Sequence, residues 1–161
     1  MLKIFNELKP FFDDVYREIS VREYAKESKI SPPTASKLLK EYETEELLIL
    51  NKKGIYIYFR ANREGHIFRQ LAKLYWFSLL YPLTKKIQEE IAYKRIILFG
   101  SLIKAENTLK SDADLYLETD ERKIDASNIE KALKREIQLH FISSMKNKYL
   151  KKNIEDGTII R

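Results

Sequence analysis

Apolar residues recur at intervals of three and four in the first part of the chain, and this spacing predicts amphipathic helices. Residues 2–18 carry the first such stripe, which Pro10 is expected to kink or divide in two. A second helix is predicted to begin at Ser20, because Ser20 and Glu23 have the spacing of a capping box. The chain is therefore expected to open with helices.

The next segment combines a third helix with a hairpin. A serine N-cap precedes Pro32, which suits the first helical position because its missing N–H costs nothing there. Apolar positions then mark one side of a helix over residues 32–44. Two short runs of apolar and aromatic residues, 47–50 and 55–60, flank a turn over residues 51–54 that ends in glycine. This order predicts a β-hairpin.

Residues 63–81 carry apolar and aromatic side chains on almost every side of a predicted helix. A helix of this kind is buried on several sides, so we expect it to join two halves of the protein or to form a homodimer interface. Beyond it, strands and helices are predicted to follow one another. These elements are a helix from Pro82 to about Tyr93, strand 95–99, a short helix, strand 113–118, helix 121–135, strand 136–142 and a lysine-rich C-terminal helix.

Composition changes this picture little. The chain has 161 residues, 44% of them apolar, so a folded protein is expected and not a disordered one. It has no cysteine, which excludes disulfides and thiolate metal sites. The net charge of +6 is shared equally between the two halves of the chain. The charge is therefore compatible with a polyanionic partner, but it does not indicate which half would bind it. We recognise no signal peptide or membrane-spanning segment, and we expect a soluble cytoplasmic protein with no membrane partner.

The stretch VREYAKESKISPPTASKLLKEYETEELL, residues 21–48, resembles the winged helix-turn-helix superfamily. It is similar in having a small residue, Ala25, within the first helix and an apolar residue, Ile30, in the turn. The resemblance covers roughly residues 1–60. It departs where such proteins usually have glycine before the wing, because this chain has two glutamates and a leucine there.

If this resemblance holds, helix 32–44 enters the major groove of DNA and the hairpin contacts phosphates. A lysine-bearing helix face can equally be solvated, and such domains can also bind proteins. The outer face of the helix carries no strong base reader, so no DNA sequence is predicted. The candidate DNA contacts are Thr34, Ser36, Lys37 and Lys40 in the helix and Tyr58 and Arg60 in the hairpin.

A second stretch, IILFGSLIKAENTLKSDADLYLE, residues 96–118, contains candidate catalytic residues. Gly100 ends a predicted strand, where the backbone can approach a ligand closely, and Ser101 offers a hydroxyl and amides to a phosphate. Asp112 and Asp114 alternate on the next predicted strand, so both carboxylates lie on one face with Cα atoms about 6.5 Å apart. Two such acids can bind a pair of Mg²⁺ ions about 3.5–4 Å apart. Ten residues separate the Gly-Ser pair from the first aspartate.

This G-S-x(10)-D-x-D pattern resembles the minimal nucleotidyltransferase family of the DNA polymerase β superfamily, over about residues 83–145. The resemblance implies a small mixed sheet with helices on one side. It also implies that Gly100 and Ser101 hold triphosphate oxygens and that Asp112 and Asp114 bind two Mg²⁺ ions. A bound nucleoside triphosphate, expected to be ATP, would donate its nucleoside monophosphate to a hydroxyl. The acceptor would be a protein or a nucleic acid, and members of this family often act on partner proteins in toxin–antitoxin pairs.

Two departures from the family pattern weigh against activity. Ala105 stands where family members commonly have a second glycine. Active members also add a third carboxylate from a later strand, and the position that aligns with it here is Gln138. A glutamine ligates Mg²⁺ weakly and cannot act as a base. Glu136 could take this role if the register differs by one pair, whereas His140 is a poor ligand for a hard cation and is expected to be structural.

The sequence predicts an α+β protein with a winged helix-turn-helix domain over residues 1–62, a hydrophobic connecting helix over 63–81 and a polymerase β-like nucleotidyltransferase domain with a small mixed sheet over 82–161. The first functional hypothesis is a Mg²⁺-dependent nucleotidyltransferase whose catalytic residues are Asp112 and Asp114. The alternative is a DNA-binding regulator or antitoxin-like protein whose nucleotidyltransferase domain is inactive, which the missing carboxylate favours. A third possibility is a protein-interaction module that binds neither DNA nor nucleotide.

Overall fold

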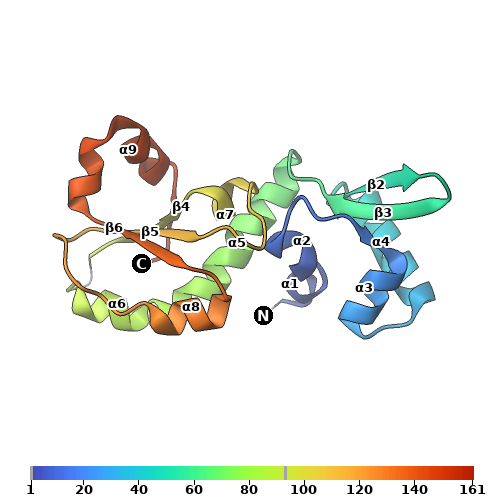
Figure 1. Ribbon diagram of the computed structural model, residues 1–161, viewed down its shortest axis with the longest axis horizontal. Coiled ribbons are helices and arrows are strands. Elements are labelled where there is room, and N and C mark those ends of the chain that lie inside the picture. Colours follow the sequence, from blue (N-terminus) through green and yellow to red (C-terminus); the bar gives the residue numbers. More distant parts are fainter. Residues whose placement is uncertain (1, 93) are drawn as a thin grey trace. The chain divides into compact units, whose positions relative to one another are not determined.

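The computed structural model describes residues 2–92 and 94–161 (Figure 1). Contacts between residues separate the chain into two compact units. The first runs to Leu71 and includes the segment Ala105–Thr108, and the second comprises Ala72–Lys104 and Leu109–Arg161. None of the described helices is long and apolar enough to cross a membrane. The three domains expected from the sequence stay a prediction.

The first unit begins with two short helices, α1 (Lys3–Glu7) and α2 (Lys9–Asp13). They confirm that Pro10 divides the predicted helix, because the proline occupies the first turn of α2, where its missing N–H is not needed. The helical segment is shorter than predicted. The Asp14 carboxylate accepts a hydrogen bond from the Tyr16 N–H at 3.0 Å, and this local bond favours a turn over a further helical turn.

Two N-caps predicted from the sequence fix the next helices, α3 (Val21–Ser28) and α4 (Pro32–Thr44). The Ser20 hydroxyl accepts a hydrogen bond from the Glu23 N–H at 3.3 Å, and the Glu23 carboxylate accepts one from the Ser20 N–H at 2.8 Å. The capping box is therefore confirmed. A hydroxyl also caps α4, where Ser31 accepts a hydrogen bond from the backbone of the third helical residue.

The predicted hairpin consists of β2 (Leu48–Lys53) and β3 (Tyr56–Ala61), and β1 (Ile19–Ser20) adds a third antiparallel strand in the order β1-β3-β2. The strands run further than predicted, because residues 51–53 pair with β3 and are not part of the turn. The turn is formed by Gly54 and the residue after it. Gly54 has a φ of +61°, the left-handed conformation that a tight hairpin turn needs.

Only the inner end of the hairpin is covered by the rest of the unit. Phe59, which pairs with Ile19 of β1, is buried. Ile57 on the same predicted face is 39% exposed, and Ile55 at the tip is 89% exposed. The tip of the hairpin therefore presents apolar side chains to solvent.

Helix α5 (His66–Leu83) is buried on one side within the chain and exposed on the other, so the burial of its exposed side in a homodimer stays a prediction. Its buried side chains are Phe68, Ala72, Tyr75, Trp76 and Leu80. Its exposed large side chains are Ile67, Leu74 and Tyr81. These three positions are seven residues apart, so they form one stripe along the helix.

The prediction that a new helix starts at Pro82 is wrong, because α5 continues through this residue. A proline in the last turn removes one hydrogen bond, and the Thr84 N–H restores the ladder by donating to the Leu80 carbonyl at 3.0 Å. Helix α6 (Lys85–Glu90) follows directly. Tyr93, the expected end of this helix, lies outside the described residues.

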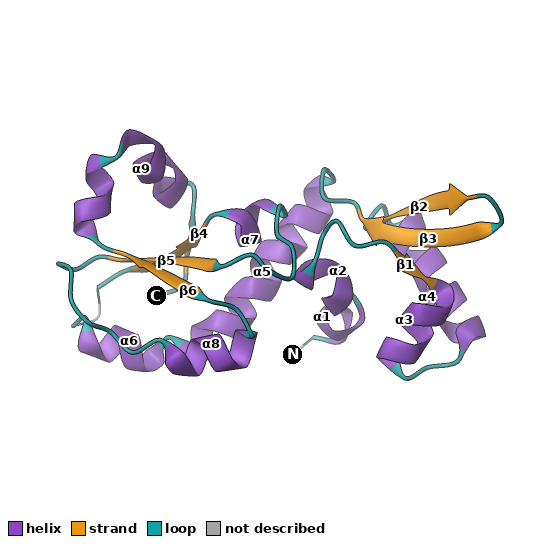
Figure 2. Ribbon diagram, in the orientation of Figure 1, coloured by secondary structure: helices purple, strands orange, loops and turns teal. Residues whose placement is uncertain are grey.

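The second unit contains a four-stranded mixed sheet in the order β6-β5-β4-β7. β5 is parallel to β6, whereas β4 is antiparallel to both of its neighbours. The strands are β4 (Ile96–Phe99), β5 (Ala113–Leu117), β6 (Ile137–His140) and β7 (Thr158–Ile159). The other elements are α7 (Ser101–Lys104), α8 (Ser127–Leu133), the 3₁₀ helix η1 (Ile142–Lys146) and α9 (Lys148–Glu155). Figure 2 shows α6 and α8 on one side of the sheet and α7 and α9 on the other, where the resemblance implied helices on one side alone.

Three elements of this unit differ from the prediction. Helix α8 starts later than residue 121, because the Asp125 carboxylate accepts a hydrogen bond from the Ser127 N–H at 3.0 Å and holds a turn there. Strand β6 ends at His140, where the 3₁₀ helix follows closely. Strand β7 was not predicted. It packs close to β4, since a Cβ on Gly157 would lie 2.4 Å from Ile97 Cγ2.

Candidate active site

Gly100 and Asp114 are in contact at the ends of two neighbouring strands. The antiparallel register of β4 and β5 sets Phe99 opposite Asp114. Gly100 follows with a φ of +81°, in the left-handed region that favours glycine. A Cβ on Gly100 would lie 2.3 Å from Asp114 Oδ2. The backbone turn is therefore shaped around this carboxylate, and a larger residue would displace it.

Asp112 lies in the loop immediately before β5 and is half-buried. Gln138 of β6 lies opposite Asp114 in the parallel register, so it is on the predicted face of the sheet. Its Nε2 donates a hydrogen bond to Asp112 Oδ2 at 2.7 Å. The side chain in the place of the expected third carboxylate is therefore an amide that already holds the first aspartate.

His140 holds the second aspartate in the same way. Its Nε2 lies 3.2 Å from Asp114 Oδ1, and the two side chains are 19% and 24% exposed. The imidazole ring packs edge-on against Phe99, with ring centroids 5.0 Å apart. The sequence analysis expected a structural histidine, and it did not predict the contact of His140 with Asp114.

Glu136, the alternative third acid, lies before β6 with its side chain exposed. Its backbone carbonyl accepts a hydrogen bond from the Ala113 N–H at 2.9 Å. Within residues 2–92 and 94–161, no cluster of three or more acidic, histidine or cysteine side chains could hold a metal ion. Any cation here would depend on Asp112 and Asp114 and on ligands supplied by a substrate.

Ala105 has a φ of +55°, in the left-handed region that favours glycine. A non-glycine residue in the left-handed region costs about 1–2 kcal/mol. The methyl group of Ala105 is buried, so it recovers part of this cost by packing. The departure from the family pattern is therefore a change of residue that keeps the glycine-like turn.

The Gly-Ser turn leads into α7, a single short helix. Ser101 is its first residue, and the side chain is half-buried. Lys104 ends the helix, and its ammonium group donates a hydrogen bond to Asn153 Oδ1 of α9 at 2.8 Å. This lysine thus links α7 to α9.

The predicted DNA-contact residues lie on the surface of the first unit. Thr34, Lys37 and Lys40 of α4 are exposed, and Ser36 is half-buried. On β3, Tyr58 and Arg60 are half-buried. Their contact with DNA stays a prediction.

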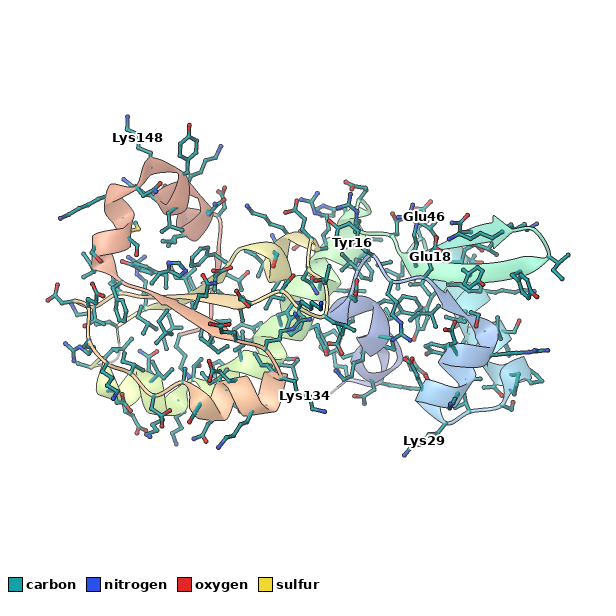
Figure 3. The ribbon with its side chains drawn as sticks, in the orientation of Figure 1. Tyr16, Glu18, Lys29, Glu46, Lys134 and Lys148 are labelled. Carbon is teal, nitrogen blue, oxygen red and sulfur yellow. The ribbon has the colours of Figure 1, made fainter. Side chains whose placement is uncertain are left out.

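One acidic side chain lies among the basic residues of the hairpin. Glu18, labelled in Figure 3, pairs with Lys53 and accepts a hydrogen bond from Asn51 Nδ2 at 2.7 Å. These hydrogen bonds and the charges of Lys53 and Arg60 hold the pKa of Glu18 below its usual range. Glu18, which precedes β1, therefore places a negative charge beside Lys53 of the hairpin, and this charge lowers the attraction of the hairpin for a polyanion.

Residues 83–161 match the family model described as Nucleotidyltransferase domain. No match was found among curated proteins or among solved structures. The matched segment contains the mixed sheet, the turn at Gly100 and Ser101, and both aspartates, each of which contacts a side chain of β6. The order of these residues agrees with the match, and the comparison therefore supports a nucleotidyltransferase domain over residues 83–161.

Proposed function

We propose that this protein is a Mg²⁺-dependent nucleotidyltransferase that transfers a nucleoside monophosphate from ATP to a hydroxyl of a protein or a nucleic acid. The observation that carries the proposal is the contact between Gly100 and Asp114. It brings the predicted phosphate-binding turn and one predicted metal ligand within van der Waals distance, although ten residues separate the Gly-Ser pair from the aspartates.

The two aspartates fit Mg²⁺ in the manner that suits a nucleotide site. This ion is commonly bound by one or two carboxylates together with substrate phosphates, and not by an all-protein cage. Asp112 and Asp114 are half-buried oxygen ligands, and their β6 neighbours are an amide and an imidazole. Bound Mg²⁺ would neutralise the triphosphate and stabilise the departing pyrophosphate.

In the proposed reaction, Gly100 and Ser101 orient the triphosphate by backbone and hydroxyl contacts. The acceptor hydroxyl oxygen forms a bond to the α-phosphorus while the bond from that phosphorus to the β-phosphate bridging oxygen breaks. Pyrophosphate leaves, and the hydroxyl proton passes to solvent. Gln138 cannot take that proton, since an amide is not a base near neutral pH.

The hydrogen bond from Gln138 to Asp112 favours a second candidate function. Where active relatives have a carboxylate, this chain has a neutral donor that occupies Asp112. Such a domain could bind Mg²⁺ and ATP without transfer, and it would then report nucleotide to the rest of the protein. In this candidate the first unit is a DNA-binding module, and the whole chain is a nucleotide-responsive regulator.

We propose DNA binding by the first unit on the basis of two features. α3, α4 and the hairpin follow one another in the order expected of a winged helix-turn-helix, and α4 exposes Lys37 and Lys40. The test is fluorescence anisotropy with labelled duplex DNA at several salt concentrations. Lys37→Glu/Lys40→Glu should abolish binding, whereas Lys85→Glu/Lys86→Glu, which changes exposed lysines of the second unit, should not. Equal DNA affinity in both double variants would rule out contact through α4.

Nucleotide transfer is tested with each α-labelled nucleoside triphosphate, Mg²⁺ and a whole-cell extract as the source of acceptors. The Asp112→Asn/Asp114→Asn variant removes the acid pair. Glu89→Gln/Glu90→Gln is its matched control, because both glutamates are exposed on α6. Macromolecular label with the wild type and the control, but not with the aspartate variant, is the expected result. Binding of Mg²⁺·ATP in calorimetry without any label would favour the second candidate, and no binding at all would reject both.

A further inference from the structure

Arg135 is the one buried charged side chain among the residues that the structure describes, with 8% of it exposed. It lies between α8 and β6. Lys134, labelled in Figure 3 at the end of α8, adopts a left-handed φ of +54° and ends that helix. Burying a guanidinium group is costly unless it makes specific contacts.

The guanidinium group joins two parts of the second unit. Its Nη1 donates a hydrogen bond to the Ser111 carbonyl oxygen at 2.6 Å. Its Cζ lies 5.1 Å from the ring centroid of Trp76, a buried residue of α5. A carbonyl in a loop is therefore fixed to an aromatic ring of the core through this one side chain.

Ser111 immediately precedes Asp112, so this contact sets the backbone on one side of the first aspartate. On the other side, the Ala113 N–H donates to the Glu136 carbonyl at 2.9 Å. The Asp112 carboxylate itself receives the hydrogen bond from Gln138. Residues 135–138 thus hold Asp112 at three points, and Arg135 supplies the contact that reaches into the core.

We propose that Arg135 is a positioning residue for Asp112, which fixes this carboxylate for Mg²⁺·ATP through the Ser111 carbonyl. The proposal rests on nucleotide binding at the acid pair. Arg135 acts through the loop and does not touch the nucleotide or the metal. Partners that orient metal-binding side chains typically contribute a factor of about 10–100 in affinity.

The first test compares Mg²⁺·ATP binding by calorimetry in full-length variants. Arg135→Met keeps much of the side-chain volume and removes the donor, and it should weaken binding about 10–100-fold. Arg135→Lys keeps a charge and a donor for the Ser111 carbonyl, and it should restore most of the affinity. Arg122→Met removes an exposed arginine of the same domain and is the matched control. Urea unfolding of each variant separates a loss of stability from a loss of affinity.

The second test needs no change at Arg135. Trp76 is the only tryptophan of the chain and lies against the guanidinium group, so its emission reports movement of Arg135. Mg²⁺·ATP should change this emission in the wild type, and Asp112→Asn should abolish the change. Binding that leaves the emission unaltered would overturn the proposed link.

The outcomes distinguish a failure of the positioning role of Arg135 from a failure of the proposed nucleotide binding. Wild-type affinity in folded Arg135→Met would overturn the positioning role and leave nucleotide binding in place. Weakened binding in Arg135→Met that Arg135→Lys does not restore would assign Arg135 a structural role only. A wild type that binds no Mg²⁺·ATP would overturn the proposed function, and the positioning role would fall with it.

Discussion

At the scale of single residues, the site depends on close contacts that leave no room for other side chains. Gly100 and Gly54 both have positive φ angles, of +81° and +61°. Only Gly100 meets another residue, because no atom lies within 4 Å of a Cβ placed on Gly54. A substitution at Gly54 therefore measures the cost of backbone strain alone, whereas a substitution at Gly100 adds the cost of displacing a carboxylate.

Gly100→Ala should lower the free energy of unfolding by more than the backbone strain of about 1–2 kcal/mol, because the new methyl group displaces Asp114. It should also weaken Mg²⁺·ATP binding at least tenfold. Gly54→Ala should show the strain alone, with unaltered nucleotide binding. Urea unfolding and calorimetry measure the two effects. Equal losses of stability and of nucleotide affinity in the two variants would contradict the contact between Gly100 and Asp114.

Gln138→Glu replaces the donor to Asp112 with a second carboxylate. Without Mg²⁺ the two like charges on neighbouring positions should lower stability by about 1 kcal/mol. Adding Mg²⁺ should remove this difference, because the cation neutralises both acids. The measurement is the thermal midpoint with and without Mg²⁺, with Gln70→Glu on the exposed part of α5 as the control. A loss of stability that Mg²⁺ does not reverse would place residue 138 away from the metal.

At the scale of elements, local hydrogen bonds decide where helices begin. The capping box of α3 and the serine cap of α4 agree with the sequence because every group involved lies within three residues. Helix α8 starts late for a similar reason, since Asp125 bonds to the backbone two residues on. The residue pattern predicted the helix, but competition from this turn shortened it.

Glu23→Gln should destabilise the protein by about 1 kcal/mol at neutral pH through the α3 cap. Hydrogen bonds from the Ser20 backbone and side chain hold the pKa of Glu23 below its usual range. The folded protein then binds protons less readily than the unfolded chain. The carboxylate therefore stabilises the fold above the unfolded pKa, and this contribution is lost as the pH falls through the folded pKa.

The difference in the free energy of unfolding between wild type and Glu23→Gln should accordingly become smaller at acidic pH. Urea unfolding at a series of pH values measures it. Glu43→Gln, at an exposed position of α4, should show little effect at any pH. A difference that grows toward low pH would contradict the assigned cap.

At the scale of the whole molecule, α5 exposes a stripe of apolar side chains to solvent. Ile67, Leu74 and Tyr81 are 59%, 48% and 44% exposed and stand seven residues apart. This is the spacing at which two helices pack along a seam, so a second copy of the same helix is the partner that fits it.

We expect the protein to form a homodimer through this stripe. Leu74→Lys should convert it to a monomer at micromolar concentration, because it puts a charge at the centre of the seam. Arg69→Glu changes an exposed position of α5 that lies away from the stripe and should leave the dimer intact. Light scattering coupled to size exclusion measures the mass. A monomeric wild type would exclude the dimer.

The sequence by itself determined what is local in this protein. Residue spacing predicted most elements, the caps of α3 and α4, the division at Pro10 and the motif of glycine, serine and two aspartates, since these depend on neighbours within a few positions. The tertiary structure alone decided what requires distant residues to meet. It paired β7 with β4, exposed one side of α5, set Asp114 against Gly100 and gave each aspartate a partner from β6. Strand register and close packing join residues that the chain separates widely, and no local pattern records these contacts.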